Sequence, residues 1–265
     1  MNLENIWGLI AGDAYFFVFL HEKVNTRIIQ LDEVGSTNEW LRENAARFVD
    51  DCVVAVADFQ TAGRGCGTNS WESERGKNLL LSILVKPKAV TADGQFALSM
   101  AGSVAMKAVL DGYTNGIALK WPNDVYWKDR KLSGTLIECS LSGRVIKSCI
   151  FGIGLNVNQC VFTSDAPNPV SLCQILGREV SRENLLNELV ESLIRHFELV
   201  EHNPSGIAKQ YAQSLYRREG YHWFKDRDGA FEAQIVEVEP SGRLRLAVRN
   251  GQMRTYAFKE VEFII

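Results

Sequence analysis

The sequence lacks the residue spacings that usually mark a metal site. It contains four histidines, without metal-ligand spacing, and six cysteines, none of which forms a C-x-x-C pair. A structural zinc site needs several such ligands close together, so we expect no protein-bound metal. The scattered cysteines, several of them within apolar runs, are typical of small buried side chains or of free thiols in a reducing compartment. They are residues 52, 66, 139, 149, 160 and 173.

Long apolar runs and a strong charge of one sign are also missing. Residues 6–20 are apolar and aromatic, but Asp13 interrupts them and no Lys or Arg precedes them. A signal peptide needs a positive start, and a membrane span needs about 20 apolar residues. The formal net charge of −3 argues against a basic surface that binds nucleic acid. We expect a cytoplasmic protein without nucleic-acid or membrane partners, whose residues 1–26 form an added helix or hairpin of unknown role.

A glycine-rich stretch runs from Gln60 to Trp71 and follows an apolar run, residues 52–57, that predicts a buried strand. Glycines at positions 63, 65 and 67 leave backbone N–H groups accessible, and Arg64 adds a fixed cation. The spacing matches neither a Walker A loop nor a Rossmann fingerprint. The stretch therefore predicts either a nest of amides that binds an anion or a flexible surface turn.

Polar side chains occur at the ends of the neighbouring elements. Ser36 and Glu39 fit a capping box that opens a helix through about Phe48. Pro122 ends a strand, residues 117–120, so that Asn123 and Asp124 are presented at the strand end. Ligands of sheet-based enzymes usually bind at such ends.

Periodicity predicts the remaining elements. Strands are expected at 27–31, 78–85, 125–127, 131–138 and 144–158, and helices at 96–110, from 181 to about 197, and at 207–216. From about residue 219 the pattern changes to short alternating runs, separated by turns, at 230–238, 243–248 and 253–258. These runs predict a small antiparallel barrel or sandwich.

Five motifs then occur in the order typical of one family. They are Ser36-Thr37-Asn38, Gln60-Thr61-Ala62-Gly63-Arg64-Gly65, Lys120-Trp121-Pro122-Asn123-Asp124, Lys131-Leu132-Ser133-Gly134 and Gly154-Leu155-Asn156. Across residues 27–265 the chain resembles the biotin protein ligases. The resemblance implies an α+β fold, in which a class II aminoacyl-tRNA synthetase-like catalytic core of mixed sheet and packed helices (27–218) precedes a small SH3-like β-barrel (219–265).

The resemblance also implies the reaction and its binding residues. Such enzymes make biotinyl-5′-AMP from biotin and ATP, release pyrophosphate, and pass biotin to a lysine of a biotin carboxyl carrier protein or domain. Mg²⁺ is expected to arrive with the triphosphate. Biotin contacts are expected from Ser36, Thr37, Asn38, Gln60, Gly63, Arg64, Gly65, Cys66, Lys131 and Gly134, and ATP contacts from Arg64, Trp71, Asn123, Lys131 and Asn156.

Three charged residues are the expected catalytic groups. Joining a carboxylate to the α-phosphate brings two anions together, which favours fixed cations, and Arg64 and Lys131 are the candidates. The acceptor amine must lose a proton before it attacks, and Asp124 is the candidate base or orienting group. Taken singly, each has a simpler interpretation, such as a solvated hairpin charge for Lys131, a turn residue for Asp124 and a strand-end cap for Asn156.

The chain departs from the family at Cys66, where many members carry a second arginine that helps to hold the adenylate. Neither Cys66 nor Gly67 carries a positive charge. The sequence therefore predicts faster release of biotinyl-AMP than from a relative with a Gly-Arg-Gly-Arg run. Stacking by Trp71 is an alternative means of retention.

Two other functions compete with biotin ligation. A lipoate ligase or transferase shares the core fold, but its lipoyl tail needs an apolar slot, and the two-arginine glycine motif of those proteins is missing. A biotin-responsive repressor needs a helix-turn-helix module of roughly 60 residues, whereas residues 1–26 alone precede the first expected core strand. Monomer and homodimer both stay open.

Overall fold

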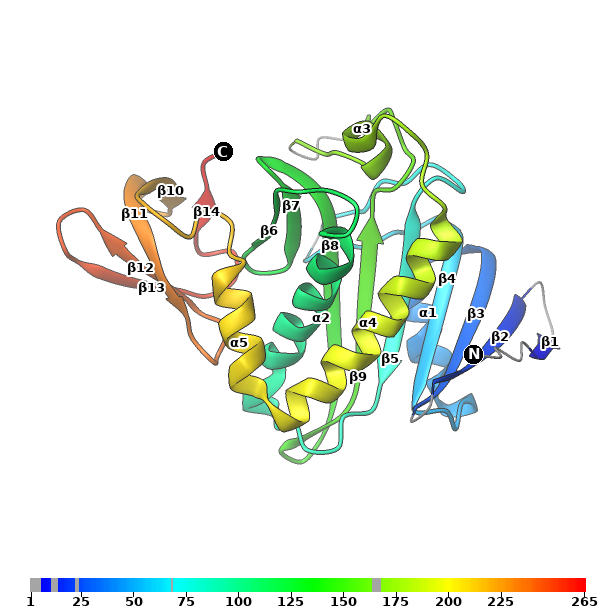
Figure 1. The fold of residues 1–265 in the computed structure, drawn as a ribbon. Helices are drawn as coiled ribbons and strands as arrows, with labels where there is room; N and C mark the ends of the chain where they lie inside the picture. Colours follow the sequence, from blue (N-terminus) through cyan, green and yellow to red (C-terminus); the bar gives the residue numbers. More distant parts are fainter. Residues whose placement is uncertain (1–5, 11–13, 22–23, 68, 164–167) are drawn as a thin grey trace.

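The computed structural model describes residues 6–10, 14–21, 24–67, 69–163 and 168–265, with side chains from residue 25 onward. Its centre is a mixed sheet of nine strands in the order β1-β2-β3-β4-β5-β9-β8-β7-β6 (Figure 1). Within the described ranges β3 and β4 pair in parallel and the other neighbours are antiparallel. The strands are β1 Ile6–Ile10, β2 Ala14–His21, β3 Val24–Val34, β4 Cys52–Gln60, β5 Leu79–Val85, β6 Ile117–Lys120, β7 Asp124–Trp127, β8 Arg130–Ser142 and β9 Val145–Leu155.

Helices cover both faces of this sheet, and the strand sequences reflect it. β4 and β5 are almost entirely buried, because apolar residues at successive positions face opposite sides. On one face lie α2 (Gln95–Leu110), α4 (Arg182–His202) and α5 (Pro204–Gln213), which are in front of the sheet in Figure 1. On the other face α1 (Thr37–Asn44) packs with a smaller apolar cluster that includes Leu41 and Val53.

The two predicted helix caps have different outcomes. Ser181 caps α4 as expected, because its hydroxyl accepts a hydrogen bond from the Asn184 N–H at 3.3 Å. The predicted capping box at α1 is wrong. Ser36 occupies the cap position without a side-chain cap bond, and Gln60 Oε1 instead accepts from the Thr37 N–H at 2.8 Å. The helix gives way to the 3₁₀ turn η1, Ala45–Arg47, rather than continuing to Phe48.

The C-terminal residues form a separate antiparallel sheet of five strands in the order β13-β12-β11-β10-β14, at the end of the molecule next to β6 (Figure 1). The three predicted strands are confirmed as β11 (Gly229–Val238), β12 (Leu244–Val248) and β13 (Met253–Tyr256). Sequence periodicity missed β10 (His222–Asp226) and β14 (Glu262–Phe263), and β14 with two residues is too short to show a repeat. It also missed α3 (Leu172–Leu176).

The N-terminal extension contributes strands to the main sheet. β1 and β2 form an antiparallel hairpin, the second of the two conformations expected for this segment. β2 continues the sheet along β3 from the pair Ala14↔Leu31 to the pair His21↔Val24. In the described ranges no helix is long and apolar enough to cross a membrane.

Candidate active site

A network of neutral polar groups lies on the α1 face of the sheet. Thr37, at the first turn of α1, donates its hydroxyl to Gln60 Oε1 at 3.0 Å and lies 2.7 Å from the Ser82 hydroxyl. Ser82 in turn donates to Asn38 Oδ1 at 2.6 Å. Thr37, Asn38 and Ser82 are buried, so the network is held in one arrangement. It offers amide and hydroxyl groups without charge, which suits a neutral polar ring.

Asn38 connects this network to a charge on β8. Its Nδ2 donates to Glu138 Oε2 at 2.8 Å and to the Leu136 carbonyl at 3.3 Å. The Asn38 side chain lies directly over Gly152, where a Cβ would overlap Oδ1. Gly152 pairs with Ser82 and Leu136 in the neighbouring strands. The close approach of α1 to the sheet therefore requires glycine at position 152.

Arg64 lies between two carboxylates. Its Nη1 is 3.2 Å from Glu39 Oε1 and its Nη2 is 3.6 Å from Glu138 Oε1. The guanidinium is thereby placed beside the neutral network, because Glu138 bonds Arg64 through one oxygen and Asn38 through the other. The Glu39 carboxylate pairs with Arg64 rather than with the backbone N–H at the start of α1.

The glycine-rich loop folds back on itself. The Trp71 N–H donates to the Gly63 carbonyl at 2.9 Å, and the Gly65 N–H donates to the Asn69 carbonyl at 2.7 Å. The N–H groups of Thr61 and Ala62 also have backbone acceptors. Of the three glycines expected to form a nest of amides, Gly65 thus has its donor already paired within the chain. For Gly63 and Gly67 the nest stays a prediction. Thr68, in the same loop, lies outside the described residues.

Lys131 and Asp124 form the second charged pair, with Nζ 2.7 Å from Oδ1. A β-bulge in β8 turns the Lys131 side chain to the face of the sheet that carries Asp124 and Gly134. Asp124 pairs with Gly134, but two residues along β7 Tyr126 pairs with Lys131 rather than with residue 132. The extra residue in β8 reverses the alternation, so Lys131 shares a face with Gly134, and a Cβ at Gly134 would lie 3.3 Å from Nζ.

Trp71 lies on a floor made of two glycines. Gly134 and Gly154 are direct partners in β8 and β9. A Cβ at Gly154 would overlap the indole ring, and one at Gly134 would lie 3.1 Å from it. Lys131 Nζ lies 5.8 Å from the ring centroid, a cation–π geometry. Within the described part of the chain the buried indole Nε1 has no hydrogen-bond partner.

A sequence model of the biotin/lipoate A/B protein ligase family matches residues 34–156. The biotin–(acetyl-CoA-carboxylase) ligase of Mycobacterium tuberculosis is 35% identical over 198 residues, which cover 70% of this chain and 71% of the relative. The chain belongs to the biotin/lipoate A/B protein ligase family. The similarity extends further in the bifunctional ligase/repressor BirA of Bacillus subtilis, which is 27% identical over 256 residues that cover 94% of this chain and 78% of the relative.

Solved structures agree with this membership. The biotin protein ligase from Aquifex aeolicus in complex with biotin and ATP superimposes with a TM-score of 0.73 at 25% identity, covering 89% of this chain and 97% of the other. The mixed sheet with its helices and the separate antiparallel sheet are therefore the biotin protein ligase fold. The resemblance found from the five sequence motifs is confirmed.

The family motifs also include a lysine, Lys120, to which the sequence assigned no role. Lys120 pairs with Asp124 in the strand register, and its Nζ lies 5.2 Å and 4.9 Å from the ring centroids of Tyr126 and Phe263. Burial lowers the pKa of Lys120, although the carboxylate of Asp124 opposes this shift. Lys120 therefore joins the Lys131–Asp124 pair to the C-terminal sheet.

Two predicted ATP contacts have protein partners. Asn123 donates through Nδ2 to the Thr135 carbonyl. Asn156 is buried, and its Nδ2 donates to the Val170 carbonyl at 3.1 Å. Both side chains thus fix backbone next to β8 and β9, as the strand-end interpretation of Asn156 expects. Their contact with ATP stays a prediction.

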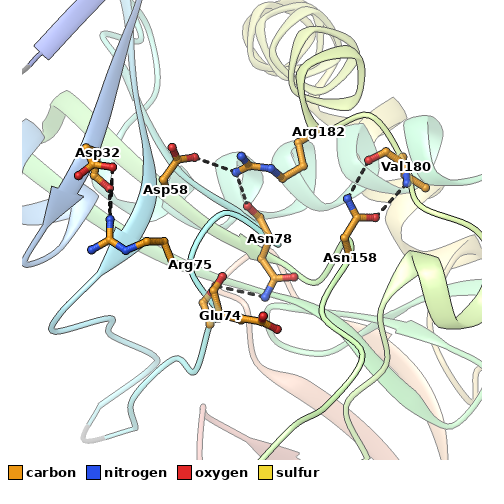
Figure 2. A network of polar contacts seen from close by, with 9 residues as sticks. Asp32, Asp58, Glu74, Arg75, Asn78, Asn158, Val180 and Arg182 are labelled. Carbon is orange, nitrogen blue, oxygen red and sulfur yellow. Dashed lines mark hydrogen bonds and ion pairs between the residues drawn. The ribbon is translucent and has the colours of Figure 1, made fainter.

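A further polar network fixes the segment that follows Trp71 (Figure 2). Asn78 donates to Gln159 Oε1 at 2.6 Å and accepts from the Val157 N–H at 2.9 Å. Arg182, at the start of α4, donates to the Asn78 carbonyl at 3.2 Å and to Asp58 Oδ1 at 3.0 Å. These bonds join β5 to the ends of β4 and β9, so the stretch that leads from Trp71 into β5 has a fixed course. No local pattern in the sequence predicts these bonds, because each of them joins distant segments.

Proposed function

We propose that the chain is an ATP-dependent biotin protein ligase. It activates biotin to biotinyl-5′-AMP with release of pyrophosphate and then transfers biotin to a lysine of a biotin carboxyl carrier protein or domain. One observation carries the proposal: a buried, uncharged network of Thr37, Asn38 and Ser82 lies beside a guanidinium, Arg64, that shares Glu138 with it. This is the arrangement expected for a neutral ureido ring bound next to an anionic reaction centre.

Activation joins the biotin carboxylate to the α-phosphate and expels pyrophosphate. Both reacting groups are anionic, so cations held in advance lower the barrier. Arg64 and Lys131 are such cations, each oriented by a carboxylate. Mg²⁺ would arrive with the triphosphate, since this ion usually binds substrate phosphates and keeps several waters.

In transfer, the amine of the acceptor lysine attacks the biotinyl carbonyl and AMP leaves. The amine is mostly protonated at neutral pH and must lose a proton first. Asp124 is the proposed base or orienting group, because its carboxylate lies on the same face as Lys131 and Gly134. The proton passes to Asp124 or through it to solvent.

The proposal extends to the whole molecule. The nine-stranded sheet with its helices would be the class II aminoacyl-tRNA synthetase-like core, residues 27–218, and the five-stranded sheet the SH3-like domain, residues 219–265. The chain would be cytoplasmic and would bind its acceptor carrier there. It would act as a monomer or a homodimer. Support for the two-part division comes from the change of strand pattern after α5.

The test is ATP–pyrophosphate exchange with biotin or lipoate offered in parallel. We expect exchange that depends on biotin. Exchange that depends on lipoate would overturn the proposal in favour of a lipoate ligase.

Lys131→Ala should lower the biotin-dependent exchange about 10²-fold or more, because a cation that faces developing charge is lost. Lys147→Ala is the matched control. Lys147 lies near the β8–β9 turn, at the other end of β9 from Gly154, and its loss should leave the rate unchanged. A folded Lys131→Ala variant with wild-type exchange would remove Lys131 from the mechanism.

A further inference from the structure

The loop that lacks a second arginine has a lysine from the far end of the chain against it. Gly67 follows Cys66 and has a positive φ of 72°. A Cβ at Gly67 would overlap Nζ of Lys259 and would lie 3.0 Å from its Cε. The ammonium group therefore touches the glycine-rich loop one residue beyond Cys66. Lys259 belongs to the C-terminal residues that follow β13.

The turn that carries Lys259 is fixed on both sides. Lys259 itself has a φ of 68°, a left-handed conformation that a long side chain rarely adopts. The turn is closed by two hydrogen bonds between Ala257 and Glu260, at 3.2 Å and 2.6 Å. The preceding Phe258 ring packs against Trp121 and Phe96, with centroid distances of 5.4 Å and 5.9 Å. The core domain thus holds the turn in the position from which Lys259 reaches Gly67.

The charge of Lys259 is not neutralised by a carboxylate in the part of the chain that the structure describes. Arg64 and Lys131 both have carboxylate partners within 4 Å, whereas the described carboxylates form no ion pair with Lys259. Glu260, its neighbour, is bound to backbone instead. A positive charge thus faces the loop next to Cys66, the position at which the resemblance to the biotin protein ligases implies a second arginine.

We propose that Lys259 is the second cation of the adenylate site, whose ammonium group contacts the phosphate of biotinyl-AMP beside Cys66. The inference rests on the proposed function and deepens it. A charge-assisted hydrogen bond from the C-terminal sheet replaces one that the loop itself lacks. Retention of the intermediate then depends on the C-terminal sheet being docked, a dependence that an arginine within the loop would not create.

The test is the dissociation rate of preformed biotinyl-AMP from wild type and from Lys259 variants. Lys259→Met keeps most of the length and removes the charge, and it should raise the rate about 10- to 100-fold, which is the loss of one charge-assisted contact. Lys259→Arg should stay near the wild-type rate. Lys147→Ala, which removes a lysine charge far from the site, should have no effect.

Two further variants separate charge from structure. Lys259→Gly relieves the left-handed backbone and should be at least as stable as wild type, yet it should release the intermediate as fast as Lys259→Met. Cys66→Arg in the Lys259→Met background should restore slow release. If wild type retains biotinyl-AMP and Lys259→Met releases it at the same rate, the inference is overturned and the proposed function stands. If wild type forms no biotinyl-AMP, the proposed function is overturned and the inference with it.

Discussion

Glu138 serves two partners at the centre of the candidate site. One carboxylate oxygen accepts from Asn38 at 2.8 Å, and the other lies 3.6 Å from Arg64. With Glu39 also beside it, Arg64 is partly neutralised at rest. On the proposed function, an incoming phosphate would compete with two carboxylates for this guanidinium, and a bidentate Arg–phosphate contact would be the stronger interaction. The ion pairs with Glu39 and Glu138 would then orient Arg64 and yield it to the phosphate.

Ser82→Ala should weaken biotin binding about 5- to 30-fold, because the hydroxyl is the bridge between Thr37 and Asn38 and a buried hydrogen bond of this kind contributes about 1–2 kcal/mol. Titration calorimetry with biotin measures the effect. Ser103→Ala is the control, since Ser103 is equally buried but bonds to Ser99 within α2. Unchanged biotin affinity in a folded Ser82→Ala variant would remove the network from the binding site.

The sequence could predict the residues whose role is visible in a local motif. Thr37, Asn38 and Gln60 were expected near one another, and the structure brings them into one network. Ser82 and Glu138 were missed, because each lies within a strand whose pattern indicates only sheet structure. Their partners lie 44 and 100 residues away in the chain, so no local spacing could show the contacts.

At the scale of elements, α2 shows how a glycine can be required inside a helix. Gly102 lies mid-helix and is buried, and a Cβ there would overlap the ring of Phe151 on β9. Phe151 is itself fully buried and packs against Phe197 of α4 at a centroid distance of 5.7 Å. The helix therefore approaches the sheet closely only because position 102 has no side chain.

Gly102→Ala should destabilise the protein by about 1–3 kcal/mol, the usual cost of overpacking a core. The opposite result, a gain of up to about 1 kcal/mol, is what helix propensity alone predicts. Urea unfolding decides between them. The double variant Gly102→Ala/Phe151→Leu should recover part of the loss, because the smaller side chain leaves room for the new Cβ.

The N-terminal hairpin can be removed to test whether it serves only the sheet edge. Because Thr26 is buried and pairs with Cys52 in β3 and β4, the deletion should end before Val24 rather than at Arg27. We expect pyrophosphate exchange to be retained, since the family motifs begin at Ser36. The exposed edge of β3 should promote self-association, which light scattering would detect. A folded, monomeric variant without exchange would show that the hairpin contributes to the site.

Most element types and positions could be predicted, and the misses have physical reasons. β5 and α2 begin within one residue of their expected starts, because long apolar periodicity is a strong signal. The start of α1 was assigned to a capping box, but tertiary contacts from Gln60 and Arg64 replaced it. β14 has two residues and α3 has five, which is too few for periodicity to show.

On the scale of the whole molecule, the two sheets share one core. The buried cluster that begins between the main sheet and α2 continues to Phe224, Ala233 and Leu244 of the C-terminal sheet. Position 242 at this junction has no room for a side chain, since a Cβ there would lie 2.8 Å from the Phe96 ring. The sequence predicted a small C-terminal β domain, but it could not show which surface of the domain contacts the main sheet or that Lys259 is thereby brought to Gly67.

Trp121→Phe tests this docking. The buried Trp121 Nε1 donates to the Gly242 carbonyl at 2.8 Å, so its removal should lower the free energy of unfolding by about 1–3 kcal/mol. Trp127→Phe is the matched control. The Trp127 indole donates to the Asn115 carbonyl at an exposed position, so this substitution should lower the free energy of unfolding less.

A continuous core predicts one cooperative unfolding transition for wild type, which near-UV circular dichroism and fluorescence would monitor. If Trp121→Phe unfolds in two separate steps, the hydrogen bond is a main support of the docked state, and biotinyl-AMP should then escape faster as well. If the variant is as stable as wild type, the apolar contacts of the shared core hold the sheets together without this hydrogen bond.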